Sequence, residues 1–316
     1  MARGAWLSEG GRRWPAAIAA LVVVGAAIGA FIGASGYAGA ATLTAIDVTD
    51  VGTDEPMIAM DPTVAPDPSG VAAARLDRRG ANENGAVATP PEVAVPLDGT
   101  LSWAFLDRAT AAMFASADLT YRQSTESMIK AWLAADELAQ AQAHGAQPGL
   151  DLISRSIRDS DDWAAETLYW NNGGDASIRR LIDTCGLTDT TIVSGWWSLT
   201  SMSAIDAVRM GECIADGTAA GPQWTEWLHD EMRQVRGEGR FGIIEAVDET
   251  TASMLAIKNG WTWHDDGWHV NCLAIDRSWV LAIMMTYPGS HGLEYGAEVC
   301  ARVAAQILRP RSERHG

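Results

Sequence analysis

The chain has 316 residues, which is enough for one large domain or two small ones. It carries 40 acidic side chains against 23 lysines and arginines, giving a formal net charge of −17 at pH 7. A surface this acidic repels phosphate backbones, so the composition argues against DNA or RNA binding.

The N-terminal segment contains a long apolar run. Residues 16–35 read AAIAALVVVGAAIGAFIGAS, which is long enough to cross a hydrocarbon core as a helix. Arginines precede the run, and the first charge after it is Asp47. The positive-inside rule predicts a cytoplasmic segment at 1–14, a single-pass transmembrane signal anchor at 15–37 and an extracytoplasmic location for the rest of the chain. Cleavage at the small residues 38–40 is the alternative.

Three glycines in this run repeat at four-residue spacing: Gly25, Gly29 and Gly33. Such spacing lets two transmembrane helices approach closely and form a dimer. The alternative is a small-residue-rich signal segment without a partner.

Residues 38–99 are predicted to be a disordered linker. Seven of the twelve prolines lie between residues 47 and 99, among alanine, glycine and aspartate, with neither helical nor alternating periodicity. Such a segment cannot bury a core. It would tether a folded domain at 100–309, followed by a disordered tail at 310–316.

The folded domain is predicted to be α+β. Two strands open it at 101–119, and apolar alternation predicts three more near its end. The segments predicted to be helical are 125–143, 148–158, 160–171, 175–185, 202–216, 222–235 and 290–308, and the late strands are 253–263, 267–275 and 278–288. We therefore expect an antiparallel five-stranded sheet flanked by helices, with a helical subdomain.

Four cysteines in an exported domain suggest disulfide bonds. Cys185 with Cys213, and Cys272 with Cys300, each join elements that should pack together. Four buried free thiols are the alternative.

Three short motifs carry candidate chemistry. In TESMIK, Ser127 lies three residues before Lys130, which places the hydroxyl and the amine on one helical face. Ser160-Asp161-Asp162 stands at the start of a later helix, and Lys258-Asn259-Gly260 ends a predicted strand. A serine with a lysine, a second hydroxyl and a second lysine form a set for acyl transfer.

The order of these motifs resembles that of the penicillin-recognising serine hydrolases, the class A β-lactamase and DD-peptidase superfamily, in its actinobacterial form. Its S-x-x-K, S-D-N and K-[TS]-G motifs correspond to 127–130, 160–162 and 258–260. The resemblance runs from about Leu101 to Leu308. It implies the serine β-lactamase fold and an acyl-enzyme mechanism without a cofactor.

The resemblance also implies roles for individual residues. Ser127 would attack a carbonyl, and Lys130, with a lowered pKa, would take its proton. Ser160 would relay a proton to the leaving nitrogen, and Lys258 would attract the carboxylate of the substrate. The oxyanion would lie between the backbone N–H groups of Ser127 and Trp261.

Three features depart from the family pattern. Asp162 replaces an asparagine, so an acceptor stands where a donor is usual, and its charge should raise the pKa of Lys130. Asn259 replaces Thr or Ser but still offers a donor. The loop at 186–201 contains no glutamate to activate water, only Asp189. The predicted substrate-binding residues are Asp162, Asn259, Gly260 and Trp261.

Other polar and aromatic residues receive less specific interpretations. His264 and His269 flank a predicted turn and are interpreted as surface residues, so no metal site is predicted. Glu166 is interpreted as a solvated helix residue. Trp196, Trp197 and Trp261 could form an apolar wall for substrate or simply pack the core.

These patterns together predict a membrane-anchored extracytoplasmic serine hydrolase. It would act on an amide or β-lactam bond through an acyl-enzyme on Ser127, with weak turnover. Its substrate would be a small molecule or a peptidoglycan-type peptide. The alternatives are a DD-peptidase-like penicillin receptor and a catalytically silent binding module on the same fold.

Overall fold

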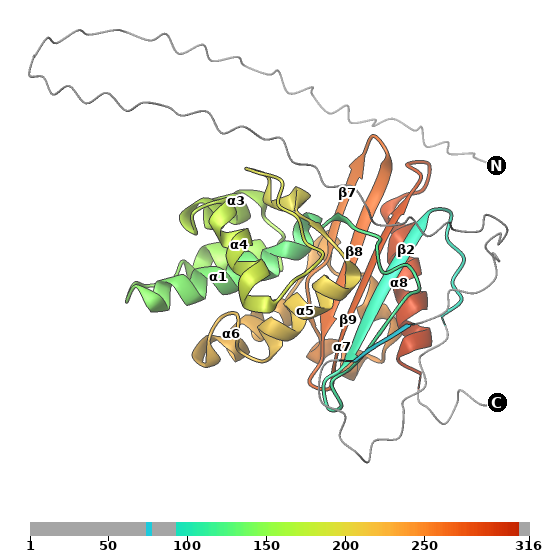
Figure 1. Ribbon diagram of the computed structural model, residues 1–316, viewed down its shortest axis with the longest axis horizontal. Coiled ribbons are helices and arrows are strands. Elements are labelled where there is room, and N and C mark those ends of the chain that lie inside the picture. The colour runs from blue at the N-terminus through green and yellow to red at the C-terminus, as the bar shows by residue number, and fades with distance from the viewer. Residues whose placement is uncertain (1–73, 78–92, 310–316) are drawn as a thin grey trace, which may run out of the picture. The chain divides into compact units, whose positions relative to one another are not determined.

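The computed structural model describes residues 74–77 and 93–309, which form an antiparallel sheet with helices on both faces. Helix α5 packs on one face of the sheet and α8 on the other (Figure 1). The sheet has seven strands in the order β1-β3-β2-β9-β8-β6, and β7 also pairs with β8. The strands of this sheet are β1 Ala74–Asp77, β2 Thr100–Asp107, β3 Ala112–Ala115, β6 Ala256–Ile257, β7 Gly260–His264, β8 Gly267–Ile275 and β9 Trp279–Tyr287.

The two central strands, β8 and β9, are the most apolar segments of the domain. Seven of nine residues in β9 are buried, and so are the last six residues of β8. Near-continuous burial is expected of strands that are covered on both faces. The Asp276 carboxylate accepts the Ser278 N–H at 2.8 Å and stabilises the turn between them. The predicted strands at 267–275 and 278–288 are confirmed.

The edge strand differs from its prediction. The segment 253–263 begins in helix α7, Glu249–Met254, and then forms β6 and β7, which are separated by Lys258 and Asn259. Asp248 caps α7 by accepting the Thr251 N–H, so the chain enters the sheet later than alternation alone suggests. This split, together with β1, raises the strand number from the predicted five to seven.

Strand β1 lies inside the segment that was predicted to be a linker. Residues 74–77 pair antiparallel with β3, which satisfies backbone groups along that edge of the sheet. Val93 is buried, and the Ala94 N–H donates to Gln306 on α8, so packing also begins before residue 100. The linker prediction is therefore wrong for these residues.

The predicted anchor at 15–37, the glycine repeat and the tail at 310–316 lie outside the described residues. In the part of the chain that the structure describes, no helix combines the length and apolar character needed to cross a membrane.

Apart from α7, which was not predicted, the helices of the described residues lie close to their predicted positions. Their bounds are α1 Lys130–Ala143, α2 Leu150–Arg158, α3 Asp162–Asn171, α4 Asp175–Cys185, α5 Ala204–Ala215, α6 Pro222–Arg233, α7 Glu249–Met254 and α8 Leu293–Ile307. The predicted helix 125–143 consists of a 3₁₀ turn, η1 (Glu126–Ile129), followed by α1. Residues 131–135 of α1 are all buried, so this helix is the core of the helical subdomain.

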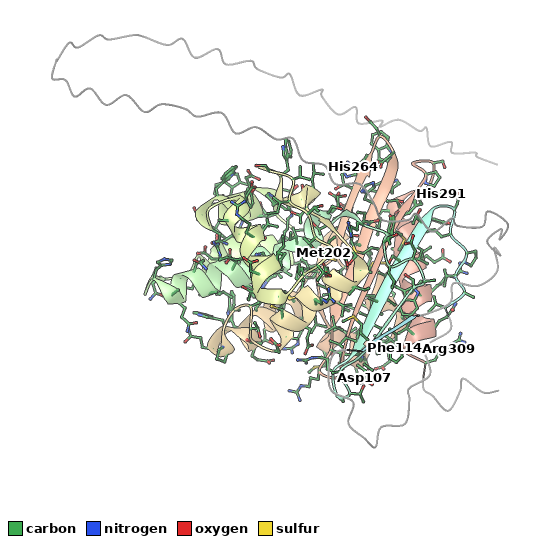
Figure 2. The ribbon with its side chains drawn as sticks, in the orientation of Figure 1. Asp107, Phe114, Met202, His264, His291 and Arg309 are labelled. Carbon is green, nitrogen blue, oxygen red and sulfur yellow. A yellow bond between two sulfur atoms is a disulfide. The ribbon has the colours of Figure 1, made fainter. Side chains whose placement is uncertain are left out.

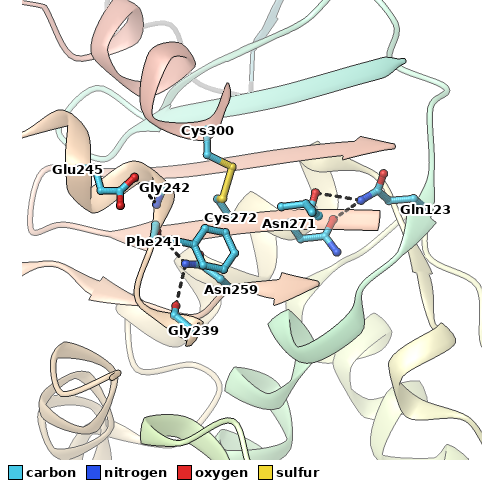
Figure 3. The surroundings of a disulfide bond; sticks show 10 residues. Gln123, Gly239, Phe241, Gly242, Glu245, Asn259, Asn271, Cys272 and Cys300 are labelled. Carbon is cyan, nitrogen blue, oxygen red and sulfur yellow. Dashed lines mark hydrogen bonds between the residues drawn. A yellow bond between two sulfur atoms is a disulfide. The ribbon is translucent and has the colours of Figure 1, made fainter. Parts of the chain in front are cut away.

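Two disulfide bonds confirm the predicted cysteine pairs. Cys185 at the end of α4 bonds to Cys213 on α5, with Cα atoms 5.5 Å apart. Cys272 on β8 bonds to Cys300 on α8, with Cα atoms 6.5 Å apart (Figure 3). One disulfide joins two helices of the helical region, and the other fixes α8 to the sheet.

Candidate active site

The turn that carries Ser127 is fixed to the sheet by a buried asparagine. Ser127 lies on η1, directly after the short strand β4 (Gln123–Ser124), and is half-buried. Asn271 on β8 donates to the carbonyls of Ser124 at 2.9 Å and Thr125 at 3.0 Å. It also accepts from the Gln123 amide (Figure 3). Asn271 was not among the residues predicted from the sequence, although a polar residue inside the apolar run of β8 was a usable signal.

The backbone of η1 also touches strand β7, at Gly260. An added Cβ there would lie 2.4 Å from the Thr125 carbonyl oxygen and 2.8 Å from the Ser127 nitrogen. Real Cβ atoms do not approach backbone this closely, so only glycine fits. Gly260 therefore brings the edge strand against the Ser127 turn.

The Ser160 hydroxyl contacts both lysines of the predicted motifs. It lies between α2 and α3 with a positive φ of 55°. Lys258 Nζ donates to the Ser160 hydroxyl at 2.9 Å, and Lys130 Nζ lies 3.3 Å from the same oxygen. Lys130 also donates to the Ser160 carbonyl at 2.6 Å. Three motifs that are far apart in the sequence thus meet at one hydroxyl.

Both lysines are fully buried. Burial lowers the pKa of Lys130, while its hydrogen bond to Asp162 at 2.6 Å and the charge of Asp162 oppose that change. Burial, and then the charge of Lys130, lower the pKa of Lys258 well below its usual value. An amine with a lowered pKa is a better proton acceptor near neutral pH. Asp162 weakens this effect at Lys130, as its position in the motif predicted.

Ser127 lines a cleft with a volume of about 1210 Å³. Trp196, Trp197 and Trp261 all line it, while Trp197 also belongs to the hydrophobic core and Trp261 packs against that core, so the two interpretations of these residues are compatible. The cleft is also acidic, and Arg236, the one arginine that lines it in the described part of the chain, is bonded to Asp159 at 2.6 Å and 2.9 Å. The carboxylates that line it are those of Glu126, Asp159, Asp162, Glu166 and Glu238.

The loop at 186–201 places an indole ring next to Lys130. The ring of Trp197, at the start of the 3₁₀ turn η2 (Trp197–Leu199), lies with its centroid 5.2 Å from Lys130 Nζ. Its N–H donates to Glu166 at 2.7 Å, so Glu166 is exposed but holds this loop rather than being merely solvated. Asp189 pairs with Arg122 at 2.6 Å and does not line the cleft.

Asn259 uses both of its amide hydrogens inside the protein. The amide donates to the carbonyls of Gly239 at 3.0 Å and Phe241 at 2.9 Å (Figure 3). The residue is 1% exposed. The donor that was expected to face substrate is therefore occupied, and it closes the loop 237–241 onto the edge strand.

Glu126 and His264 lie beside Ser127 and line the same cleft. His264 Nε2 donates to Glu126 Oε1 at 2.9 Å, from the turn end of β7 (Figure 2). Glu126 was assigned no role from the sequence, because a carboxylate next to a serine has no distinctive pattern.

Comparison with known proteins agrees with this fold. A sequence model described as "Beta-lactamase enzyme family" matches residues 142–309. A Mycobacterium tuberculosis protein whose name describes it as a lipoprotein, LppW, is 32% identical over 184 residues, which is 53% of this chain. Its Mycobacterium bovis counterpart matches equally. The matched stretch spans only 56% of the length of these relatives.

Solved structures similar to the domain are class A and related β-lactamases. An ancestral class A β-lactamase is 16% identical with a TM-score of 0.56, covering 67% of this chain and 94% of its own. A β-lactamase from Xanthomonas campestris is 13% identical with a TM-score of 0.55, covering 67% and 91%. At such identities the likeness concerns the fold. Because the family model spans more than half of the chain, the protein belongs to the β-lactamase enzyme family.

Proposed function

We propose that the protein is a serine hydrolase that forms an acyl-enzyme on Ser127 and releases the acyl group slowly. The observation that carries this proposal is the convergence of Lys130 and Lys258 on the Ser160 hydroxyl, in the cleft that Ser127 lines. Lys130 would accept the proton of Ser127, and Ser160 would pass a proton to the leaving group. The N–H groups of Ser127 and Trp261 would hold the oxyanion.

Slow release is expected from the groups beside Lys130. Hydrolysis of an acyl-enzyme needs a base that activates water, and such a base is worth about a hundred- to ten-thousand-fold in rate. The Trp197 ring faces Lys130, and Glu166 is engaged by two indole N–H groups, of Trp197 and Trp170. An indole cannot accept a proton, so this side of the cleft supports acylation without rapid hydrolysis.

The cleft also favours substrates without a carboxylate near the leaving group. Asn259 has no free donor, Arg236 is paired, and the buried Nζ of Lys258 already donates to Ser160 and to its neighbouring carbonyl. The acidic lining adds repulsion for an anion. A neutral or cationic amide or ester therefore fits better than a typical β-lactam.

We further propose that the domain acts outside the cytoplasm, attached to the membrane. Two disulfide bonds are typical of oxidising compartments. A relative named as a lipoprotein supports membrane attachment. Single-pass anchoring through 15–37 is a prediction from the sequence alone.

A second candidate function is ligand binding without covalent chemistry. The Lys130 ammonium has three acceptors within reach, the Ser160 carbonyl and hydroxyl and Asp162, and each distance is 3.3 Å or less. No hydrogen bond joins Lys130 to the Ser127 hydroxyl among the described residues. A lysine held in this way as a charged donor would not act as a base.

The test is to incubate purified full-length protein with p-nitrophenyl acetate and, separately, with a fluorescent penicillin. Intact-mass measurement and peptide mapping then track any adduct over time. We expect one long-lived acetyl group on Ser127 and weaker labelling by the penicillin. Rapid steady turnover would contradict slow release, and the absence of any Ser127 adduct at neutral and alkaline pH would favour the binding module.

A further inference from the structure

A second cluster of chemically active side chains lies between the Ser127 turn and the hairpin of β7 and β8. His269 pairs with Thr262 across the hairpin, and His264 lies two residues beyond Thr262. Cross-strand partners share a face and so do alternate residues, so both imidazoles project from one face. Their ring centroids are 4.6 Å apart. Gly260 and Asn271, which contact the Ser127 turn, pair on this same face.

Glu126 completes the cluster from the opposite side. Its side chain is 4% exposed, and its backbone has a positive φ of 49°. Such a conformation is unfavourable for a residue with a side chain and persists only where surrounding contacts hold it. Here the carboxylate meets His264 at 2.9 Å and the Ser124 hydroxyl at 2.5 Å.

With a neutral His269, this cluster has one more hydrogen-bond acceptor than it has protons to donate. His269 Nε2 lies 3.2 Å from Asp266, and His269 Nδ1 lies 2.7 Å from the Ser124 hydroxyl. A neutral imidazole that donates to Asp266 leaves Nδ1 with a lone pair. The single proton of Ser124 then faces two acceptors, Nδ1 and the Glu126 carboxylate. A cation among these atoms would satisfy both.

The geometry suits a metal ion. The available ligand atoms of Glu126, His264 and His269 all lie within 4.8 Å of one another. Tetrahedral zinc with bonds of about 2.0–2.2 Å holds its ligand atoms about 3.4 Å apart, so small side-chain rotations are enough. A carboxylate on the second nitrogen of a histidine, as Asp266 provides here, is the usual support of a zinc-bound imidazole.

We propose that Glu126, His264 and His269 bind one zinc ion beside Ser127. Two imidazoles and one carboxylate favour zinc over magnesium or calcium, which prefer oxygen ligands alone. Three protein ligands leave a fourth position open, as in catalytic zinc sites. Glu126 and His264 line the cleft, so that position would present a bound water or a substrate oxygen to the same space as Ser127.

The test is calorimetric titration of zinc sulfate into chelator-treated, tag-free full-length protein. We expect one zinc per chain and no comparable binding of magnesium. His269→Gln and His264→Gln should each weaken binding by more than about a hundred-fold, since each removes a ligand. Circular dichroism of each variant establishes that it is folded.

If a histidine variant unfolds, a milder substitution at Asp266 still tests the zinc site. Asp266 is 73% exposed, so Asp266→Asn should fold normally and weaken zinc binding about ten- to a hundred-fold. Asp265→Asn removes the same charge from the same turn and should leave the affinity unchanged. Absence of zinc binding, or equal losses in both aspartate variants, would overturn the proposal.

Zinc binding at this site does not require acylation of Ser127. Zinc stoichiometry is measured without any acylating probe and should be retained in Ser127→Ala. Zinc binding without any Ser127 adduct would contradict the proposed hydrolase activity and support the zinc site. An adduct without zinc binding would contradict the zinc site and support the hydrolase activity.

Discussion

The two sides of the Ser127 cleft differ in how their polar groups are used. On one side, Lys130 from α1 and Lys258 from the edge strand are buried and converge on the Ser160 hydroxyl, and burial lowers the pKa of both. On the other side, formed by the loops 186–201 and 237–241, polar groups are bonded to the protein itself. Asn259 donates to the backbone of 239–241, and the Trp197 indole donates to Glu166.

In the proposed mechanism, this difference separates two parts of one reaction. The first side holds the groups that would form an acyl bond, whereas the polar groups of the second side are not free to bind a substrate carboxylate or to activate water. A donor that is satisfied within the fold contributes to stability but is not available to a ligand, because breaking its bond leaves buried groups unpaired. Membership of a family therefore does not by itself transfer each step of the family's chemistry.

The largest expected effect is the loss of Ser127. Ser127→Ala should abolish covalent labelling by p-nitrophenyl acetate, because Ser127 is the proposed nucleophile. Intact-mass measurement records the adduct. Ser198→Ala, which alters another serine that lines the cleft, should label normally. Labelling that survives Ser127→Ala would place the chemistry elsewhere.

Displacing the Ser127 turn should reduce the rate of acylation, although less than the loss of Ser127 does. Gly260→Ala would press a methyl group against the backbone of residues 125–128. A shift of about 1 Å in a reacting group can reduce a rate about a hundred-fold, so we expect a loss of that order in the rate of acylation.

Gly239→Ala is the matched control for this change. Its Cβ would meet the Trp261 ring at 3.4 Å, an ordinary contact, so acylation should change little. Equal losses in both variants would mean that the approach of β7 to the Ser127 turn has no special role.

Removing the charge of Asp162 should accelerate acylation. Asp162 raises the pKa of Lys130 against the effect of burial, so Asp162→Asn should lower that pKa further. More free amine is then present at neutral pH, and the rise of acylation with pH moves to lower pH. One pKa unit corresponds to about a ten-fold gain in rate at neutral pH.

Adduct formation measured by intact mass between about pH 6 and about pH 10 records this change. This range lies below the pKa of a free lysine. Asp151→Asn removes an exposed charge on α2 and should leave the profile in place. A profile that does not move in Asp162→Asn would mean that Lys130 is not the titrating base.

The smallest expected effect concerns the charge of the substrate's leaving group. Two esters with the same acyl group, one leaving as 3-hydroxybenzoate and the other as 3-hydroxybenzamide, differ by one negative charge. With Asn259 and Arg236 engaged, we expect the neutral ester to acylate the protein faster, by about ten-fold at low salt. A preference for the anionic ester would show that Lys258 or Arg236 is available to a carboxylate.

Much of the fold and part of the site could be predicted from the sequence, because they depend on local chemistry. Apolar alternation in 267–275 and 278–288 predicts β8 and β9, since each strand must bury its own side chains. The order of the three motifs predicts that Ser127, Ser160 and Lys258 belong together. The cysteine pairs were predictable because their helices and strands had to pack against one another.

Only the tertiary structure decides which of these groups remain available. Asn259 is occupied because the fold brings residues 239 and 241 to it, and Trp197 faces Lys130 because of the path of the 186–201 loop. Glu126 and His264, separated by 138 positions, meet only through the contact of β7 with the Ser127 turn. A sequence specifies which donors and acceptors exist, whereas their partners depend on distances that arise only when the chain has packed.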